Sequence, residues 1–164
     1  MVVGLGNPIL SDDGVGLVVL RALRDRADLR GVTLVEAETG GLGLIDILSG
    51  HDGAVLVDAV VTGAVNPGEI LEVAPSFVET TGRLGTAGLS HQVDLGTAWE
   101  LGRRLGVPLP SHVRILGIEA SDVKTFSERL TPAVARNLPA IVDAVIRVVA
   151  EVRARGARGS ERTA

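Results

Sequence analysis

Three polar side chains in this chain belong to types that can do chemistry together: Asp13, Asp58 and His91. Two carboxylates and an imidazole form a mixed set of oxygen and nitrogen donors. Such a set is compatible with nickel, zinc, manganese or iron, and it does not choose among these metals. A carboxylate in the set can also act as a general base on a water molecule. The chain has no cysteine, which excludes a zinc–thiolate site, a cysteine nucleophile and a disulfide framework.

Each of these residues also has a structural interpretation. Asp12 or Asp13 can cap the helix that follows, because an aspartate oxygen accepts bonds from the first free amides of a helix. His91 can be an ordinary residue at the start of a helix. Asp58 is harder to explain in this way, because it interrupts the apolar run "GAVLVDAVV" and a buried carboxylate is costly without a partner. Spacing alone leaves the metal site and the structural roles both open.

The elements that must position these residues alternate between strands and helices. Hydrophobic periodicity predicts strands over residues 2–5, 32–37, 53–61, 70–73 and 113–118, and helices over residues 14–27, 42–48, 90–105 and 131–152. Residues 75–90 are predicted to form a loop. The order predicts a three-layer α/β/α sandwich with about five strands, mostly parallel, and one antiparallel strand from residues 70–73. Ligands in such sheets bind at the carboxyl ends of the strands, where we expect the three polar residues.

Composition and charge exclude several classes of protein. The net charge of −4 argues against a nucleic-acid partner, which requires a basic face. No apolar run reaches the length of a membrane span, and no basic leader precedes the first strand, so a cytoplasmic protein with no membrane partner is expected. Residues 1–152 are predicted to form a single domain, and the Arg-rich residues 153–164 a disordered tail.

The segment "GLGNPILSDDGVG", residues 4–16, begins like a phosphate-binding loop. However, Ile9 stands where G-x-G-x-x-G requires its third glycine, and Asp12 and Asp13 would repel a pyrophosphate at the helix N-terminus. A dinucleotide is therefore not expected, nor any other organic cofactor. The opening "GLGNP" is also similar to that of the peptidyl-tRNA hydrolases, but the Tyr and the histidine-bearing stretch that follow in that family are missing here.

The chain resembles a second family much more closely. "GLGNPILSDDGVGLVVLRAL" is similar to the N-terminal signature of the hydrogenase maturation proteases, in which G-x-G-N is followed by an acidic pair and Gly-x-Gly. "ETGGLGLIDIL" resembles their Gly-rich recognition loop, "AVLVDAVVTGAVNPGEI" their central strand, and "GLSHQVDLGTAWEL" their Ser/Thr-rich loop that leads to a histidine. "VRILGIEA" and "LTPAVARNLPAIVDAV" resemble their closing strand and helix. The resemblance runs from Val2 to about Val149.

The resemblance implies a phosphorylase/hydrolase-like fold and a specific proteolytic activity. The expected protein is an endopeptidase that removes a C-terminal peptide from the nickel-loaded precursor of a nickel–iron hydrogenase large subunit. The resemblance assigns metal contact and catalysis to Asp13, Asp58 and His91. It assigns substrate binding to the glycines of the recognition loop, Gly40, Gly41 and Gly43.

The resemblance also implies that the substrate supplies the nickel. The chemistry that breaks the peptide bond is left open between two types. A metalloprotease-like reaction would use a metal to polarise the carbonyl or activate water, and an aspartic-type reaction would use Asp13 or Asp58 as general base. The alternative function is a nickel-state sensor or chaperone that binds the same precursor without cutting it. His51 and His112 match no functional position and are predicted to be structural.

Overall fold

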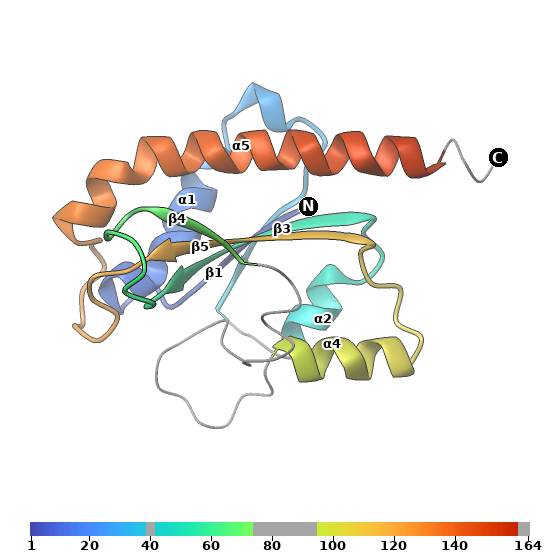
Figure 1. Cartoon of the computed structure of the whole chain (residues 1–164), viewed down its shortest axis with the longest axis horizontal. Helices are drawn as coiled ribbons and strands as arrows, with labels where there is room; N and C mark the ends of the chain where they lie inside the picture. The colour runs from blue at the N-terminus through green and yellow to red at the C-terminus, as the bar shows by residue number, and fades with distance from the viewer. Residues whose placement is uncertain (39–41, 74–94, 161–164) are drawn as a thin grey trace.

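The computed structural model describes residues 1–38, 42–73 and 95–160, and it has the predicted three-layer architecture (Figure 1). One five-stranded sheet has the order β2-β1-β3-β5-β4. β4 runs antiparallel to β5, and the other neighbours are parallel, as the sequence predicts. The strands are β1 (Val2–Leu5), β2 (Leu34–Ala37), β3 (Gly53–Val60), β4 (Ile70–Val73) and β5 (His112–Glu119).

Helices cover both faces of this sheet. α1 (Val15–Leu23) and α5 (Pro132–Ser160) lie on one face, and α2 (Leu42–Leu48) and α4 (Leu95–Arg104) lie on the other (Figure 1). Two 3-10 turns, η1 (Ser11–Gly14) and η2 (Ala27–Leu29), flank α1. The parallel strands point toward the end of the molecule where α5 begins, so their carboxyl ends form one edge there, here called the carboxyl edge. The opposite edge is called the amino edge.

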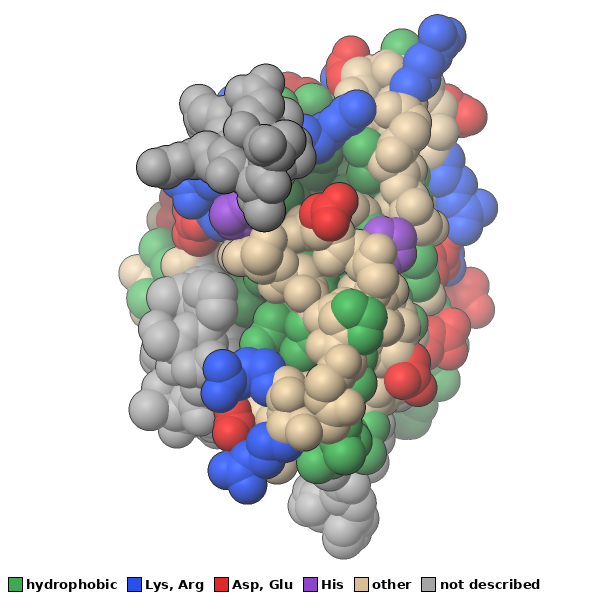
Figure 2. Space-filling model, turned by 90° about the vertical axis from the view of Figure 1, so that its right-hand side faces the viewer, with side chains coloured by type: hydrophobic (Ala, Val, Ile, Leu, Met, Phe, Trp, Pro, Cys, Tyr) green, Lys and Arg blue, Asp and Glu red, His purple; other side chains and the backbone are tan. Residues whose placement is uncertain are grey.

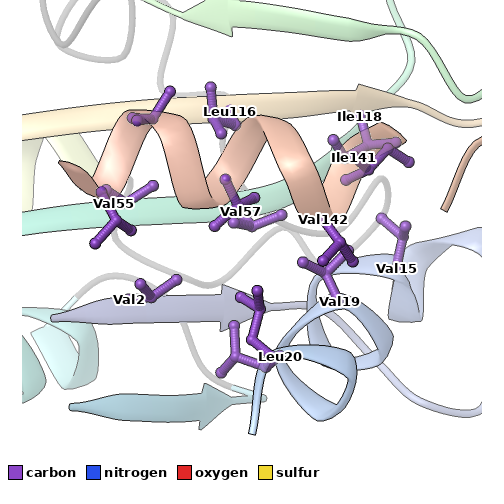
Figure 3. Packing of buried hydrophobic residues seen from close by; sticks show 14 of the residues in the cluster. Val2, Val15, Val19, Leu20, Val55, Val57, Leu116, Ile118, Ile141 and Val142 are labelled. Atoms are coloured by element: carbon purple, nitrogen blue, oxygen red, sulfur yellow. The ribbon is translucent and has the colours of Figure 1, made fainter. Parts of the chain in front are cut away.

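Two aliphatic clusters, one on each face, hold the layers together. The alternation of side chains along a strand sends Val55 and Val57 of β3 toward α1 and α5 (Figure 3). Leu56, between them, points to the other face and packs in the cluster that includes residues of α2 and α4. β3 is therefore buried on both faces, which explains why its sequence is apolar almost throughout. The described residues include no helix that is both long enough and apolar enough to cross a bilayer.

The structure corrects two predicted helix ends. α1 ends at Leu23 and not near residue 27, because the hydrogen bonding changes there to the 3-10 pattern. The backbone N–H of Arg24 donates to the carbonyl oxygen of Arg21, three residues earlier. α5 continues to Ser160, beyond the predicted end near Val152. Residues 153–160 are therefore helical and do not form the disordered tail that their composition predicts, because adding residues to an existing helix avoids the cost of starting one, despite the two glycines in this segment. Residues 90–94 of the predicted fourth helix lie outside the described residues.

Candidate active site

The glycines of the opening segment allow two stretches of backbone to pass closely. A Cβ atom added at Gly4 would lie 2.3 Å from the carbonyl oxygen of Gly16, and one added at Gly16 would lie 2.4 Å from that of Val57. Gly6 has a φ of 137°, and a Cβ there would fall 1.8 Å from the carbonyl oxygen of Asp13. These glycines therefore seat η1 and the start of α1 against β1 and β3.

Asp13 lies in η1 and is almost fully buried, with 3% of its surface exposed. Its Oδ2 atom accepts a hydrogen bond of 3.0 Å from the backbone N–H of Asn7. Burial raises the pKa of Asp13 above the ordinary aspartate value, and the bond from Asn7 offsets part of that rise. A carboxyl group with a raised pKa at a sheet edge is suited to proton transfer.

Asp58 lies in β3 and has no exposed surface. Its Oδ1 atom accepts a hydrogen bond of 2.9 Å from the backbone N–H of Ala59. Strand alternation places Asp58 on the same face as Leu56, and the register of β3 with β5 sets it opposite Gly117. Because η1 packs against β3, Asp13 and Asp58 stand on adjoining elements.

These two carboxylates stand where the winding of the sheet reverses. The chain leaves β1 through α1 on one face, reaches β2, and returns through α2 on the other face to β3. β1 and β3 are neighbours, but the connection after β1 leads to β2 on one side of the pair, and the connection after β3 leads to β4 on the other side. Ligands of open α/β sheets bind at such a switch point, outside the carboxyl ends of the strands.

Asp12 has a role that its place in an acidic pair does not reveal. The side chain is fully buried. Its two oxygens accept four hydrogen bonds: from Thr131 N at 2.7 Å, Thr131 Oγ1 at 2.9 Å, Ser121 N at 2.9 Å and Asp122 N at 3.1 Å. The donors lie in the loop after β5 and at the start of α5. Asp12 therefore ties η1 to that loop and to α5, and it caps no helix of its own segment.

Glu119, which sequence analysis passed over, is a second structural acid at this edge. It ends β5 and is 3% exposed. Its carboxylate accepts bonds from Thr62 N at 2.8 Å, Thr62 Oγ1 at 2.5 Å and Gly63 N at 2.8 Å. Burial raises the pKa of Glu119, but these three bonds together lower it below the ordinary glutamate value. The only sequence signal was an acid at the end of an apolar strand.

Three of the predicted site residues, His91, Gly40 and Gly41, lie outside the described residues, and Gly43 lies in the first turn of α2. Over residues 1–38, 42–73 and 95–160, no three His, Asp or Glu side chains are grouped so that they could hold a metal ion. The described part of the site therefore contributes two carboxylates, Asp13 and Asp58. Their oxygens are donors that a divalent metal accepts.

The two other histidines lie at the opposite edge of the sheet. His51 follows α2, and His112 is the first residue of β5. Together with Asp52 and Arg153 they line a cavity of about 290 Å³. Figure 2 looks onto the amino edge and shows histidine, acidic and basic side chains on its surface. The structure thus places these histidines at the other end of β3 and β5 from the candidate site.

Comparison with known proteins gives one consistent family. The sequence model of a family described as hydrogenase maturation protease matches residues 17–148. The hydrogenase expression/formation protein HupD of Rhizobium leguminosarum bv. viciae is 26% identical over 154 residues, which cover 91% of this chain and 73% of that protein. The hydrogenase 2 maturation protease of Escherichia coli K12 is 26% identical over 153 residues, covering 92% of this chain and 90% of that protein.

Solved structures show the same fold. The hydrogenase maturating endopeptidase HybD from Escherichia coli superposes with a TM-score of 0.74 at 22% identity, covering 92% of this chain and 91% of that one. The [NiFe] hydrogenase maturation protease HybD from Thermococcus kodakarensis gives a TM-score of 0.61 at 21% identity, covering 90% of this chain and 96% of that one. At these identities the solved structures establish only the fold, and the match to the family model is what assigns this sequence to the family.

Proposed function

Because the chain belongs to the hydrogenase maturation protease family, we propose that it removes a C-terminal peptide from the nickel-loaded precursor of a nickel–iron hydrogenase large subunit, in the cytoplasm. The observation that carries the proposal is the placement of Asp13 and Asp58 on adjoining elements at the switch point of the sheet. Both are buried carboxylates at the edge where α/β enzymes bind their ligands.

In this proposal nickel is part of the substrate, and the protein needs no organic cofactor. Asp13 and Asp58 supply oxygen ligands and His91 a nitrogen ligand when the precursor docks, and this donor set fits nickel. Nickel held there supplies Lewis-acid polarisation of the scissile carbonyl. The glycines Gly40, Gly41 and Gly43 would let the backbone of the precursor approach closely.

The environments of the two aspartates suggest different tasks. Asp13, whose pKa is raised by burial in the protein without substrate, is the better candidate for a general base, and it would act through the carboxylate oxygen that does not contact the metal. It would take a proton from the attacking water as the water oxygen bonds to the carbonyl carbon, and pass that proton to the departing amide nitrogen. Asp58 belongs to the central strand, and its Oδ1 atom is fixed by the amide of Ala59. It would orient the metal-binding side of the substrate.

The test compares two forms of the precursor. Purified protein is incubated with nickel-loaded and with nickel-free large-subunit precursor, and the intact mass of the large subunit is measured. We expect loss of a C-terminal peptide from the loaded form only. Cleavage of both forms would contradict the role of nickel as the recognition element. Binding of the loaded form with no change in mass would contradict the protease and support a sensor or chaperone.

A further inference from the structure

Most of the large apolar side chains that are exposed in the described residues lie in connections at one end of the sheet. Six large hydrophobic residues are exposed among the described residues. Four of them follow the four parallel strands at the carboxyl edge, one in each connection: Ile9 after β1, Leu42 after β2, Val61 after β3 and Phe126 after β5. Isolated exposed apolar residues need no explanation, but one at the end of every parallel strand is a pattern.

We propose that these four residues, here called the apolar rim, dock the body of the hydrogenase precursor around the candidate active site. The inference rests on the proposed function, because it takes the substrate from there. It goes beyond that function in assigning affinity for the precursor to side chains that take no part in the cleavage.

Phe126 and Ile9 form the best-defined part of the rim. Phe126 is 81% exposed and Ile9 is 47% exposed. The two segments are joined by a parallel β-bridge between Leu10 and Ser127. Ile9 and Phe126 are the residues that immediately precede these two partners, so they lie next to each other across the bridge. Ser127 N donates to Ile9 O at 3.0 Å, and Ser11 N donates to Ser127 O at 2.7 Å.

Hydrogen bonds hold the backbone beneath this pair in place. The carboxylate of Asp12, which lies between the two segments, accepts bonds from Ser121, Asp122 and Thr131. The side chain of Ser11 adds a bond of 3.2 Å to the carbonyl oxygen of Arg129. An apolar surface that is already ordered loses little entropy on binding, which is the property of an interface anchor.

The position of the rim identifies its occupant. Ile9 precedes Asp13 by four residues on the same loop, and Val61 follows Asp58 by three residues on the connection after β3. A folded protein that presents a peptide bond to both carboxylates must cover the connections that carry them. Charged and polar residues flank Phe126 in the sequence, namely Lys124, Thr125, Glu128 and Arg129, all exposed. An apolar centre with a polar surround is the usual anatomy of a protein–protein interface.

The experiment separates docking from cleavage. Binding of the nickel-loaded precursor is measured by biolayer interferometry in an Asp58→Asn background that is slow to cleave, and kcat and KM are measured in the otherwise native protein. We expect Phe126→Ser to weaken binding and raise KM about tenfold with kcat within about twofold, and Ile9→Ser/Phe126→Ser to weaken binding further. Leu105→Ser is the matched control, because Leu105 is 71% exposed but follows α4, far from the rim in sequence and fold.

The outcomes distinguish the two proposals. Unchanged affinity and KM in the double variant, with normal cleavage by the native protein, would overturn the docking rim and leave the proposed function standing. Rim-dependent binding without cleavage by the native protein would support the rim and overturn the protease. An equal loss of affinity in Leu105→Ser would overturn the rim as a specific surface. All serine variants replace exposed side chains, so their melting temperatures should match that of the native protein.

Discussion

Ionisable side chains are buried at one edge of the sheet and more exposed at the other. At the carboxyl edge Asp12, Asp13, Asp58 and Glu119 are all buried. At the amino edge the charged and titratable groups around the cavity are half-buried or exposed: His51, Asp52, His112 and Arg153. Burial of a carboxylate is unfavourable unless hydrogen bonds compensate it, so its repeated occurrence at one edge needs a specific cause. The contrast favours the carboxyl edge as the place of the proposed chemistry.

Burial alone does not separate reactive acids from structural ones, because the carboxyl edge contains both. Asp12 accepts four hydrogen bonds from the loop after β5 and the start of α5. Glu119 accepts three from the connection after β3. Both acids therefore fasten loops to the sheet edge. The pKa of Glu119 is lowered by its bonds, whereas burial raises the pKa of Asp13. Glu119 and Asp13 therefore differ in the direction of their pKa shifts, and a raised pKa is the one that suits proton transfer.

The largest effect is expected from Asp58→Asn. The amide keeps the shape of the side chain but removes the negative charge, so we expect the cleavage rate of the loaded precursor to fall about 100-fold or more. The melting temperature should stay close to that of the native protein, because the amide has nearly the same size and its oxygen can still accept the hydrogen bond from Ala59 N. Intact-mass kinetics and thermal unfolding measure the two effects. Cleavage at the native rate would remove Asp58 from the site.

The next effect tests the structural acids. Asp12→Ala leaves the donors of Ser121, Asp122 and Thr131 without their acceptor, and we expect the free energy of unfolding to fall by about 3 kcal/mol. Asp28→Ala is the matched control. Asp28 is exposed and pairs only with Arg26 in the described structure, so its loss should change stability by less than about 1 kcal/mol. Equal changes in urea unfolding would show that the bonds of Asp12 add nothing to stability.

Features of this site that depend on neighbouring residues could be predicted from the sequence, and features that depend on residues far apart in the chain could not. The alternation of strands and helices and the position of Asp58 in a central strand follow from local periodicity, and both are confirmed. The role of Asp12 could not be predicted, because its donors lie more than one hundred residues away in the chain. Glu119 was missed because its donors, Thr62 and Gly63, are also distant in the chain, at 57 and 56 residues.

At the end of α5, a prediction from local composition was wrong. An Arg-rich terminal segment has the composition of a disordered tail, and local composition carried that prediction. Whether such a segment continues a helix depends on the helix before it, whose apolar residues pack against the sheet up to Val152. The prediction of His91 as a third ligand stays a prediction, because His91 lies outside the described residues.

A smaller effect is expected in the pH dependence of stability, which should differ between Asp13 and Glu119. The folded pKa of Asp13 is raised, so its ionisation opposes folding: its contribution to stability is present below the unfolded pKa and is lost as pH rises through the folded value. The folded pKa of Glu119 is lowered, so its contribution is present above the unfolded pKa and is lost as pH falls through the folded value. Relative to the native protein, Asp13→Asn should therefore be more stable near neutral pH and Glu119→Gln less stable. Both differences should shrink on acidification, as urea unfolding over a pH series measures, and differences of the same sign would contradict the distinction.

The smallest effect is expected at the amino edge. His51→Ala and His112→Ala remove side chains that lie at the opposite end of β3 and β5 from Asp58, and no hydrogen bond among the described residues links them to it. We expect cleavage of the loaded precursor within about twofold of the native rate, which is the range of effects that reach a site only through small changes in packing. The same kinetic assay measures this alongside Asp58→Asn. A loss as large as that of Asp58→Asn would mean that the amino edge takes part in the reaction, and the separation of the two edges would fail.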